Sequence, residues 1–143
     1  MATLTTANSA LALQVRNLFP TPQNIKGYAT DDSFAVEDVN PAEVYMGVDG
    51  MLSGGYVPYV TILSLTLQAD SPSTAMFDAV LAAQVAAKEL YIFDGVIILQ
   101  GTGEKYIFTK GFMTAATPMS TAKKVLLPRK FTITFESCSK APV

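Results

Sequence analysis

The chain has 143 residues, of which 50% are hydrophobic and 15% are charged, and its net charge is −2. This length predicts a single domain, and the apolar composition excludes an intrinsically disordered chain. The sequence holds one cysteine, Cys138, and no histidine. It therefore lacks the residues for an intrachain disulfide, a cysteine-based zinc site or a Ser–His or Cys–His catalytic pair. We expect no enzyme activity, no metal and no cofactor, and a surface partly covered by partners.

The single domain is expected to span residues 1–143, beginning with a short N-terminal arm at about residues 1–12. This arm has no positive cluster and no sustained apolar stretch, so it is unlike a signal peptide. No apolar run has the length of a membrane-spanning helix. Short strands are predicted at residues 13–19, 33–39 and 44–48.

Residues 47–58 are rich in glycine and carry apolar side chains. Glycine permits the dihedral angles of a projecting hairpin, and apolar residues at a loop tip are costly unless a partner buries them. We interpret the segment as a docking loop. The alternative is a hairpin that turns at Asp49-Gly50 and packs its apolar residues inward. The residues predicted to dock are Asp49, Gly50, Met51, Leu52, Gly54, Gly55 and Tyr56.

Alternation of apolar and polar side chains predicts half-buried antiparallel strands at residues 61–69, 104–113 and 130–137. In the second of these strands, Tyr106, Phe108 and Phe112 are expected to share one face. The dipeptide Asp94-Gly95 is typical of a two-residue hairpin turn. It would join strands at 90–93 and 96–100.

One helix is predicted at about residues 72–89, where alanine is frequent and Pro72 is tolerated in the first turn. One side of this helix carries Ala79, Ala82, Ala83 and Ala86. A face of alanines without long charged side chains suits close approach to a sheet or to another subunit. The pattern leaves both possibilities open. Together, these elements predict a mainly β domain, an antiparallel β-sandwich or barrel with one flanking helix.

Charge is segregated along the chain. Residues 27–87 contain eight acidic residues and no basic one, whereas residues 104–143 contain seven basic residues and two acidic ones. A run of like charge usually marks a solvated face. The alternative is complementarity, in which the acidic segment of one copy meets the basic segment of the next. The residues assigned to such contacts are Asp31, Asp32, Glu37, Asp38, Lys123, Lys124, Arg129 and Lys130.

Four stretches resemble the tail tube proteins of bacteriophages with contractile tails: DSFAVEDV (32–39), MGVDGMLSGGYVP (46–58), LQADSPSTA (67–75) and LPRKFTITFE (127–136). The resemblance spans about residues 14–137. It extends to the related tube proteins of pyocins and type VI secretion systems. It rests on order and composition rather than on a diagnostic motif.

The resemblance implies a structural virion protein of the tail, assembled in the host cytoplasm. Six copies would form a ring, and rings would stack through the 47–58 loop into a hollow tube inside a contractile sheath. Its partners would be further copies of itself, the sheath protein, and the tape-measure, baseplate and tail-terminator proteins, with DNA passing through during ejection. No membrane insertion by this chain is expected.

A duct for DNA should not grip phosphates, so a lining without strong positive charge is expected. The mild polar faces of the 61–69 and 130–137 strands meet this requirement. The residues assigned to the lumen are Ser64, Thr66, Gln68, Thr132, Thr134 and Glu136.

A different class of function is a monomeric β-sandwich module that binds a ligand such as a glycan. Such modules use aromatic platforms, and the sequence has no tryptophan. The tyrosines that could form a platform are Tyr28, Tyr45, Tyr56 and Tyr59.

Overall fold

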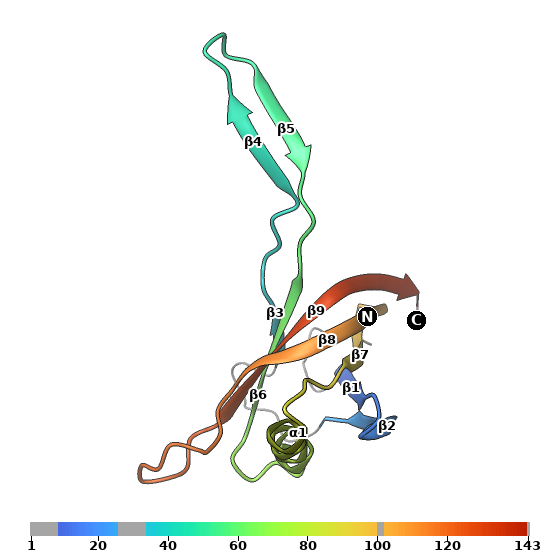
Figure 1. Cartoon of the computed structure of the whole chain (residues 1–143), viewed down its shortest axis with the longest axis vertical. Coiled ribbons are helices and arrows are strands. Elements are labelled where there is room, and N and C mark those ends of the chain that lie inside the picture. The colour runs from blue at the N-terminus through green and yellow to red at the C-terminus, as the bar shows by residue number, and fades with distance from the viewer. Residues whose placement is uncertain (1–8, 26–33, 100–101, 143) are drawn as a thin grey trace.

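The computed structural model describes residues 9–25, 34–99 and 102–142 (Figure 1). The strands are β1 (Ser9–Val15), β2 (Phe19–Asn24), β3 (Phe34–Val36), β4 (Ala42–Met46), β5 (Leu52–Tyr56), β6 (Thr61–Leu67), β7 (Phe93–Leu99), β8 (Glu104–Ala116) and β9 (Arg129–Pro142), and the helix is α1 (Thr74–Ala87). Mainly β structure with one helix follows, as the sequence predicted.

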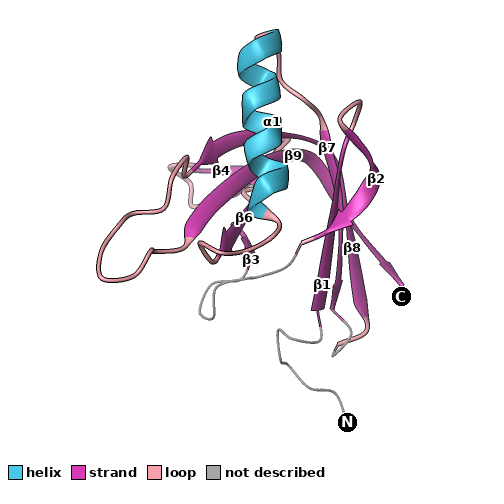
Figure 2. Ribbon diagram, turned by 90° about the horizontal axis from the view of Figure 1, so that it is seen from below, coloured by secondary structure: helices cyan, strands magenta, loops and turns pink. Residues whose placement is uncertain are grey.

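Seven strands form one antiparallel sheet in the order β2-β1-β7-β8-β9-β6-β3, and β4 and β5 form a separate two-stranded hairpin. The large sheet curves, and α1 lies along its concave side (Figure 2). Its edge strands are β2, which contains Pro20 and Pro22, and β3, which has three residues. The buried side chains of this sheet and of α1 form one core cluster, which is the layered packing expected of a sandwich-like β domain.

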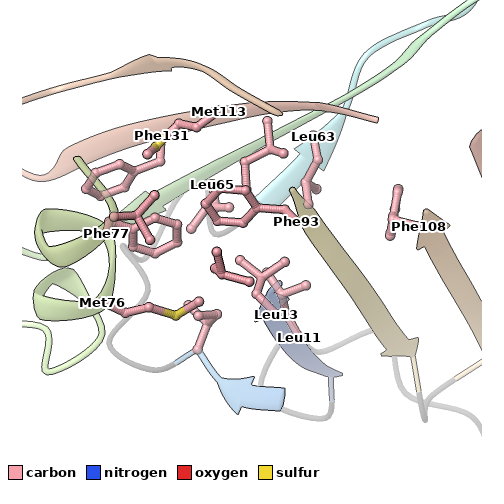
Figure 3. Close-up of a cluster of buried hydrophobic side chains, with 14 of the residues drawn as sticks. Leu11, Leu13, Leu63, Leu65, Met76, Phe77, Phe93, Phe108, Met113 and Phe131 are labelled. Atoms are coloured by element: carbon pink, nitrogen blue, oxygen red, sulfur yellow. The ribbon is translucent and has the colours of Figure 1, made fainter. Parts of the chain in front are cut away.

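The predicted alternation is confirmed in β6 and β9. Leu63 pairs with Ile133 and Leu65 with Phe131 across the two strands, and all four side chains are buried. In Figure 3, Leu13 of β1 points into the same cluster from the other end of the sheet. Burial of apolar surface on one face of each strand therefore sets the register of the sheet.

Helix α1 occupies most of the predicted range, about 72–89. Its buried residues are Met76, Phe77 and Val80, and the Phe77 ring stacks on that of Phe131 with 4.3 Å between centroids. The helix ends at Lys88, whose left-handed conformation lets its N–H bond to the carbonyl of Gln84. The stacking of Phe77 on Phe131 holds the helix on β9, as the fold class of a β domain with a flanking helix requires.

The predicted turn at Asp94-Gly95 is wrong, because both residues lie inside β7. Gly95 pairs with Leu13 of β1, and a Cβ at Gly95 would lie 2.8 Å from the Leu13 Cδ2 atom. The Asp94 carboxylate accepts hydrogen bonds from the Arg16 guanidinium and from the Lys110 backbone N–H. Gly95 is needed for close packing against Leu13, and Asp94 is needed for hydrogen bonds to neighbouring segments. These long-range contacts outweigh the local turn signal.

One further strand prediction and the N-terminal arm require correction. The strand predicted at residues 13–19 is broken, because β1 ends at Val15 and Asn17 adopts a left-handed turn (φ 70°) before β2 begins. Residues 9–12, expected in an N-terminal arm, pair with β7 as part of β1, and residues 1–8 lie outside the described part of the chain.

Phe112 does not share the inward face of β8 with Phe108. Lys110 has a positive φ of 51°, which interrupts the alternation of side chains along the strand. Gly111 and Met113 therefore face the core, while Phe112 is half-buried and pairs with Thr134. A single left-handed residue thus reverses the faces of the strand beyond it.

Candidate assembly surfaces

The β4–β5 hairpin is closed by a tight turn at Asp49-Gly50, the turn that the alternative interpretation of this segment contained. Gly50 has a φ of +82° and donates its N–H to the Gly47 carbonyl at 3.0 Å. The Asp49 Oδ1 atom accepts a hydrogen bond from the Met51 N–H at 3.0 Å. Glycine supplies the left-handed backbone, and the aspartate side chain fixes the tip.

The hairpin has one apolar face that none of the described residues covers. Because residue 44 pairs with 54 and residue 46 with 52, successive pairs alternate between the two sides of the ribbon. One side carries Ala42, Val44, Met46, Leu52 and Tyr56. Every residue of β4 and β5 is exposed, and Figure 1 shows the ribbon extending away from the seven-stranded sheet. The alternative of inward packing is therefore contradicted.

The alanine face of α1 is also uncovered within the chain. Ala79, Ala82 and Ala86 are exposed and Ala83 is half-buried, while neighbouring Val85 is 77% exposed. Burial of this face within its own chain is therefore not found among residues 9–25, 34–99 and 102–142. The small side chains leave a smooth apolar surface where a second backbone can approach closely.

The β8–β9 connection, residues 117–128, forms a third exposed surface, which we call the basic loop. It is folded on itself, since the Leu127 N–H bonds to the Thr121 carbonyl at 3.0 Å and Ala122 bridges Leu126. Lys123 and Lys124 are exposed on it. Its exposed apolar residues are Met119, Val125 and Leu126. Sequence reasoning missed these three, although the apolar run after Lys123-Lys124 was a visible signal.

Arg129 is an exception among the residues assigned to contacts between copies. It is buried, with 7% exposure, and it binds within its own chain. Its Nη2 atom lies 2.6 Å from Oδ1 of Asp78 on α1, and its Nε donates to the Thr117 carbonyl at 3.0 Å. Hydrogen bonding to this guanidinium lowers the pKa of Asp78. Arg129 therefore ties the helix and the basic loop to β9, and it is not available to an acidic segment of another copy.

The remaining charged residues are distributed over separate surfaces. Glu37 and Asp38 are exposed just after β3, at the base of the hairpin, and Lys130 is exposed on β9. Glu37 and Asp38 line an open hollow of about 470 Å³ together with Glu136. Asp31 and Asp32 lie outside the described residues. Among the described residues, no ion pair joins Glu37 or Asp38 to Lys123, Lys124 or Lys130.

The residues assigned to the lumen share one face of β6 and β9, opposite the core. Ser64 pairs with Thr132, and Thr134 exchanges a hydroxyl hydrogen bond with Thr114 of β8 at 3.1 Å. Thr66, however, pairs with Lys130, which brings one positive charge onto this face. Gln68 and Glu136 are exposed at its ends. The face therefore carries hydroxyl groups, the apolar side chains of Ile62 and Phe112 beside Thr134, and one charge of each sign.

The tyrosines do not form one aromatic platform. Tyr45 and Tyr56 lie on opposite faces of the β4–β5 ribbon, because Tyr56 pairs with Ala42 and Tyr45 with Ser53. Tyr56 and Tyr59 both line the hollow at the hairpin base. Tyr28 lies outside the described residues. The described residues also hold no cluster of three or more acidic or thiol side chains suited to a metal ion, and no helix of sufficient length and hydrophobicity to cross a membrane.

Comparison with known structures identifies the fold. A chain of the PVC extracellular contractile injection system, from its sheath–tube complex in the extended state, is 13% identical with a TM-score of 0.60 over 93% of this chain and 88% of that one. A chain of the anti-feeding prophage baseplate is 14% identical with a TM-score of 0.61, covering 100% and 99%. A chain of the anti-feeding prophage cap, which terminates the tube, is 14% identical with a TM-score of 0.64, covering 100% and 93%.

These likenesses confirm, at the level of the fold, the resemblance to tail tube proteins found in the sequence. Comparison with curated proteins gives no match. The model of one protein family, described as tail fiber protein gp32, matches residues 2–139. Because this match covers nearly the whole sequence, the chain belongs to the tail fiber protein gp32 family.

Proposed function

We propose that the chain is a structural tail subunit, six copies of which form a ring, and that these rings stack into a hollow tube inside a contractile sheath. The observation that carries this proposal is the β4–β5 hairpin, a ribbon with one apolar face in which every residue is exposed. An isolated two-stranded hairpin is at best marginally stable in water. A partner that covers its apolar face would remove both the exposure and the marginal stability.

The distribution of uncovered surfaces supports a subunit whose function is to contact others. The hairpin, the alanine face of α1 and the basic loop are three separate exposed apolar surfaces on one small chain. Monomeric soluble proteins rarely leave large contiguous apolar patches exposed. Repeated contacts between copies, each using a different pair of surfaces, would cover all three. Head-to-tail contacts of this kind generate rings and filaments.

The known assemblies with this fold support the choice of partners. They are a sheath–tube complex, a baseplate and a tube-terminating cap. We therefore assign sheath, baseplate, tail-terminator and tape-measure proteins as partners, and the tail of a particle assembled in the host cytoplasm as the location. The family description names a tail fiber protein, which likewise supports a role in a tail. The role is structural rather than enzymatic.

The outer face of β6 and β9 suits the lining of such a tube. Its hydroxyl groups, on Ser64, Thr66, Thr132 and Thr134, offer weak neutral contacts to a sliding polyanion. Continuous positive charge would hold phosphates by releasing their counterions. The single Lys130 on this face is balanced by Glu136 farther along the same strand.

Electron microscopy of the purified chain tests the proposal. Negatively stained samples over a range of protein concentrations are expected to contain six-fold rings and stacks of rings, with sedimentation velocity giving the mass of the smallest species. A reconstruction of the tubes should show the hydroxyl face of β6 and β9 lining the lumen. A chain that stays monomeric at every concentration would contradict the proposal, and so would a lumen lined mainly by lysines.

A further inference from the structure

The tip of the β4–β5 hairpin and the basic loop lie at opposite ends of the molecule. In Figure 1, where the longest axis is vertical, the hairpin tip is at the top and the loop between β8 and β9 is at the bottom. Neither end is covered by the rest of the chain, as the exposure of Met51 at one and of Val125 at the other shows. Two complementary ends on one axis are the requirement for head-to-tail association of identical copies.

The charges at the two ends are opposite in sign. The hairpin, residues 42–56, contains Glu43 and Asp49 and no basic residue, whereas residues 117–128 contain Lys123 and Lys124 and no acidic residue. Asp70 lies beside the loop and reduces the net charge of that end to +1. Opposite charges across an interface set its register and favour the correct partner over others.

The shapes of the two ends are also compatible. Val48, Met51 and Leu52 make the tip of the hairpin a narrow apolar wedge, and all three side chains are exposed. At the other end, the basic loop and the segment after β6 enclose an open hollow of about 580 Å³. It is lined by Gln68, Ala69, Asp70, Lys124, Val125, Leu126 and Pro128. Val125, Leu126 and Pro128 give the hollow an apolar side suited to the apolar tip, and Lys124 gives it a cation suited to the Asp49 carboxylate, although Asp70 also lines it.

We propose that the hairpin tip of one copy docks into the hollow beside the basic loop of a copy in the adjacent ring. In this contact Met51 and Leu52 cover Val125 and Leu126, and the Asp49 carboxylate faces Lys124. The inference rests on the proposed stacking and adds to it the surface that receives the hairpin. It also gives the tube a direction, because every subunit has its tip at one end and its receiving surface at the other.

The lone cysteine makes a direct test possible, since Cys138→Ser leaves a chain without thiols. In that background, one preparation carries Val48→Cys at the tip and a second, differently tagged, carries Lys124→Cys. The two are mixed, assembled and oxidised. We expect a disulfide-linked pair that contains both tags. Val48→Cys mixed with Lys88→Cys, at the end of α1, is the matched control and should not cross-link.

The outcomes separate this inference from the proposed function. Tubes that form without the 48–124 cross-link would overturn the docking surface and leave the proposed function standing. A 48–124 cross-link obtained in isolated single rings would make the contact lateral and overturn the axial arrangement. Absence of rings and tubes with the unmodified chain would count against the proposed function itself, and the docking surface would fall with it.

A charge reversal gives a second measurement on the same contact. Lys124→Glu would place like charges together at the interface, so we expect the concentration for half-assembly to rise at least about tenfold. Salt should reduce the effect, because the screening length falls from about 10 Å at 0.1 M to about 3 Å at 1 M. Lys88→Glu is the control of equal charge change. An equal response of the two variants would overturn the assignment of Lys124.

Discussion

Asp78→Asn tests whether the Asp78–Arg129 pair holds the helix and the basic loop to the sheet. The variant keeps the size and one acceptor of the side chain but removes the charge that faces Arg129. The guanidinium then stays in its buried position with the carbonyls of Thr117 and Pro118 and one amide oxygen as acceptors, and without a counter-charge. An incompletely paired charge in a buried site destabilises the folded state.

The expected loss follows from the burial of the two partners. Breaking a fully buried ion pair costs about 3–5 kcal/mol, and breaking a solvent-exposed one costs about 0–1 kcal/mol. The Arg129 side chain is 8% exposed and that of Asp78 is 51% exposed, so water screens one partner and not the other. We therefore expect Asp78→Asn to lower the free energy of unfolding by about 1–2 kcal/mol, as measured by denaturant titration at pH 7.

The loss of unfolding free energy in Asp78→Asn should also depend on pH, in a direction set by the pKa of Asp78. The pKa of Asp78 is lowered in the folded state from its ordinary value of 3.8, chiefly by the hydrogen bond from Arg129. A lowered pKa stabilises the fold at pH values above the ordinary pKa, and this stabilisation is lost as the pH falls through the lower, folded-state value. The difference between the native chain and Asp78→Asn should therefore be constant from about pH 7 to pH 5 and shrink below about pH 4.

Asp70→Asn is the matched control, because Asp70 is exposed and takes part in no ion pair among residues 9–25, 34–99 and 102–142. Its effect on the free energy of unfolding should stay within about 0.5 kcal/mol. Equal losses of unfolding free energy for Asp78→Asn and this control would contradict the role given to the Asp78–Arg129 pair. A loss that persists unchanged at pH values where Asp78 is protonated in both the folded and the unfolded state would contradict that role as well.

Two other variants address packing and assembly. A Cβ on Gly111 would lie 2.5 Å from Cδ1 of the buried Phe135 ring, so Gly111→Ala should cost about 1–3 kcal/mol of unfolding free energy, whereas Gly55→Ala, with open space around it, should cost less than about 1 kcal/mol; equal losses would contradict the packing argument. Met51→Asp combined with Leu52→Asp should leave a folded chain, by circular dichroism, that forms no stacked rings in electron micrographs. Long tubes of this double variant would show that the hairpin tip is not the contact between rings.

The elements that periodicity could predict are those in which one face is buried along the whole length. Strand β6 alternates over its whole length, β9 alternates from Arg129 to Glu136, and α1 is rich in alanine, so local signals agree with the tertiary structure in these segments. The prediction failed at Asp94-Gly95, where a turn-like dipeptide is held straight by partners in β1 and β8. A dipeptide signal carries no information about strands that lie on both sides of it.

The assembly surfaces were predictable to a similar extent. The projecting hairpin could be predicted, because its glycines and apolar residues are contiguous in the sequence. The internal role of Arg129 was not, since its partner Asp78 is 51 residues away and the sequence pattern does not show that they meet. Charge counted along the chain therefore overstated the surface available to a second copy. To predict that the apolar residues of the basic loop are exposed, one would have to know which parts of the chain pack on the loop.

The short, proline-containing edges of the large sheet have a consequence for the fidelity of association. An open sheet edge pairs with almost any extended chain, because backbone groups do not distinguish one sequence from another. Pro20 and Pro22 remove two N–H donors from β2, and β3 offers only three residues. Unrelated unfolded chains in a crowded cell therefore have few free backbone groups at these two edges with which to pair. Association then depends on side-chain surfaces, which distinguish a copy of the same sequence from an unrelated protein.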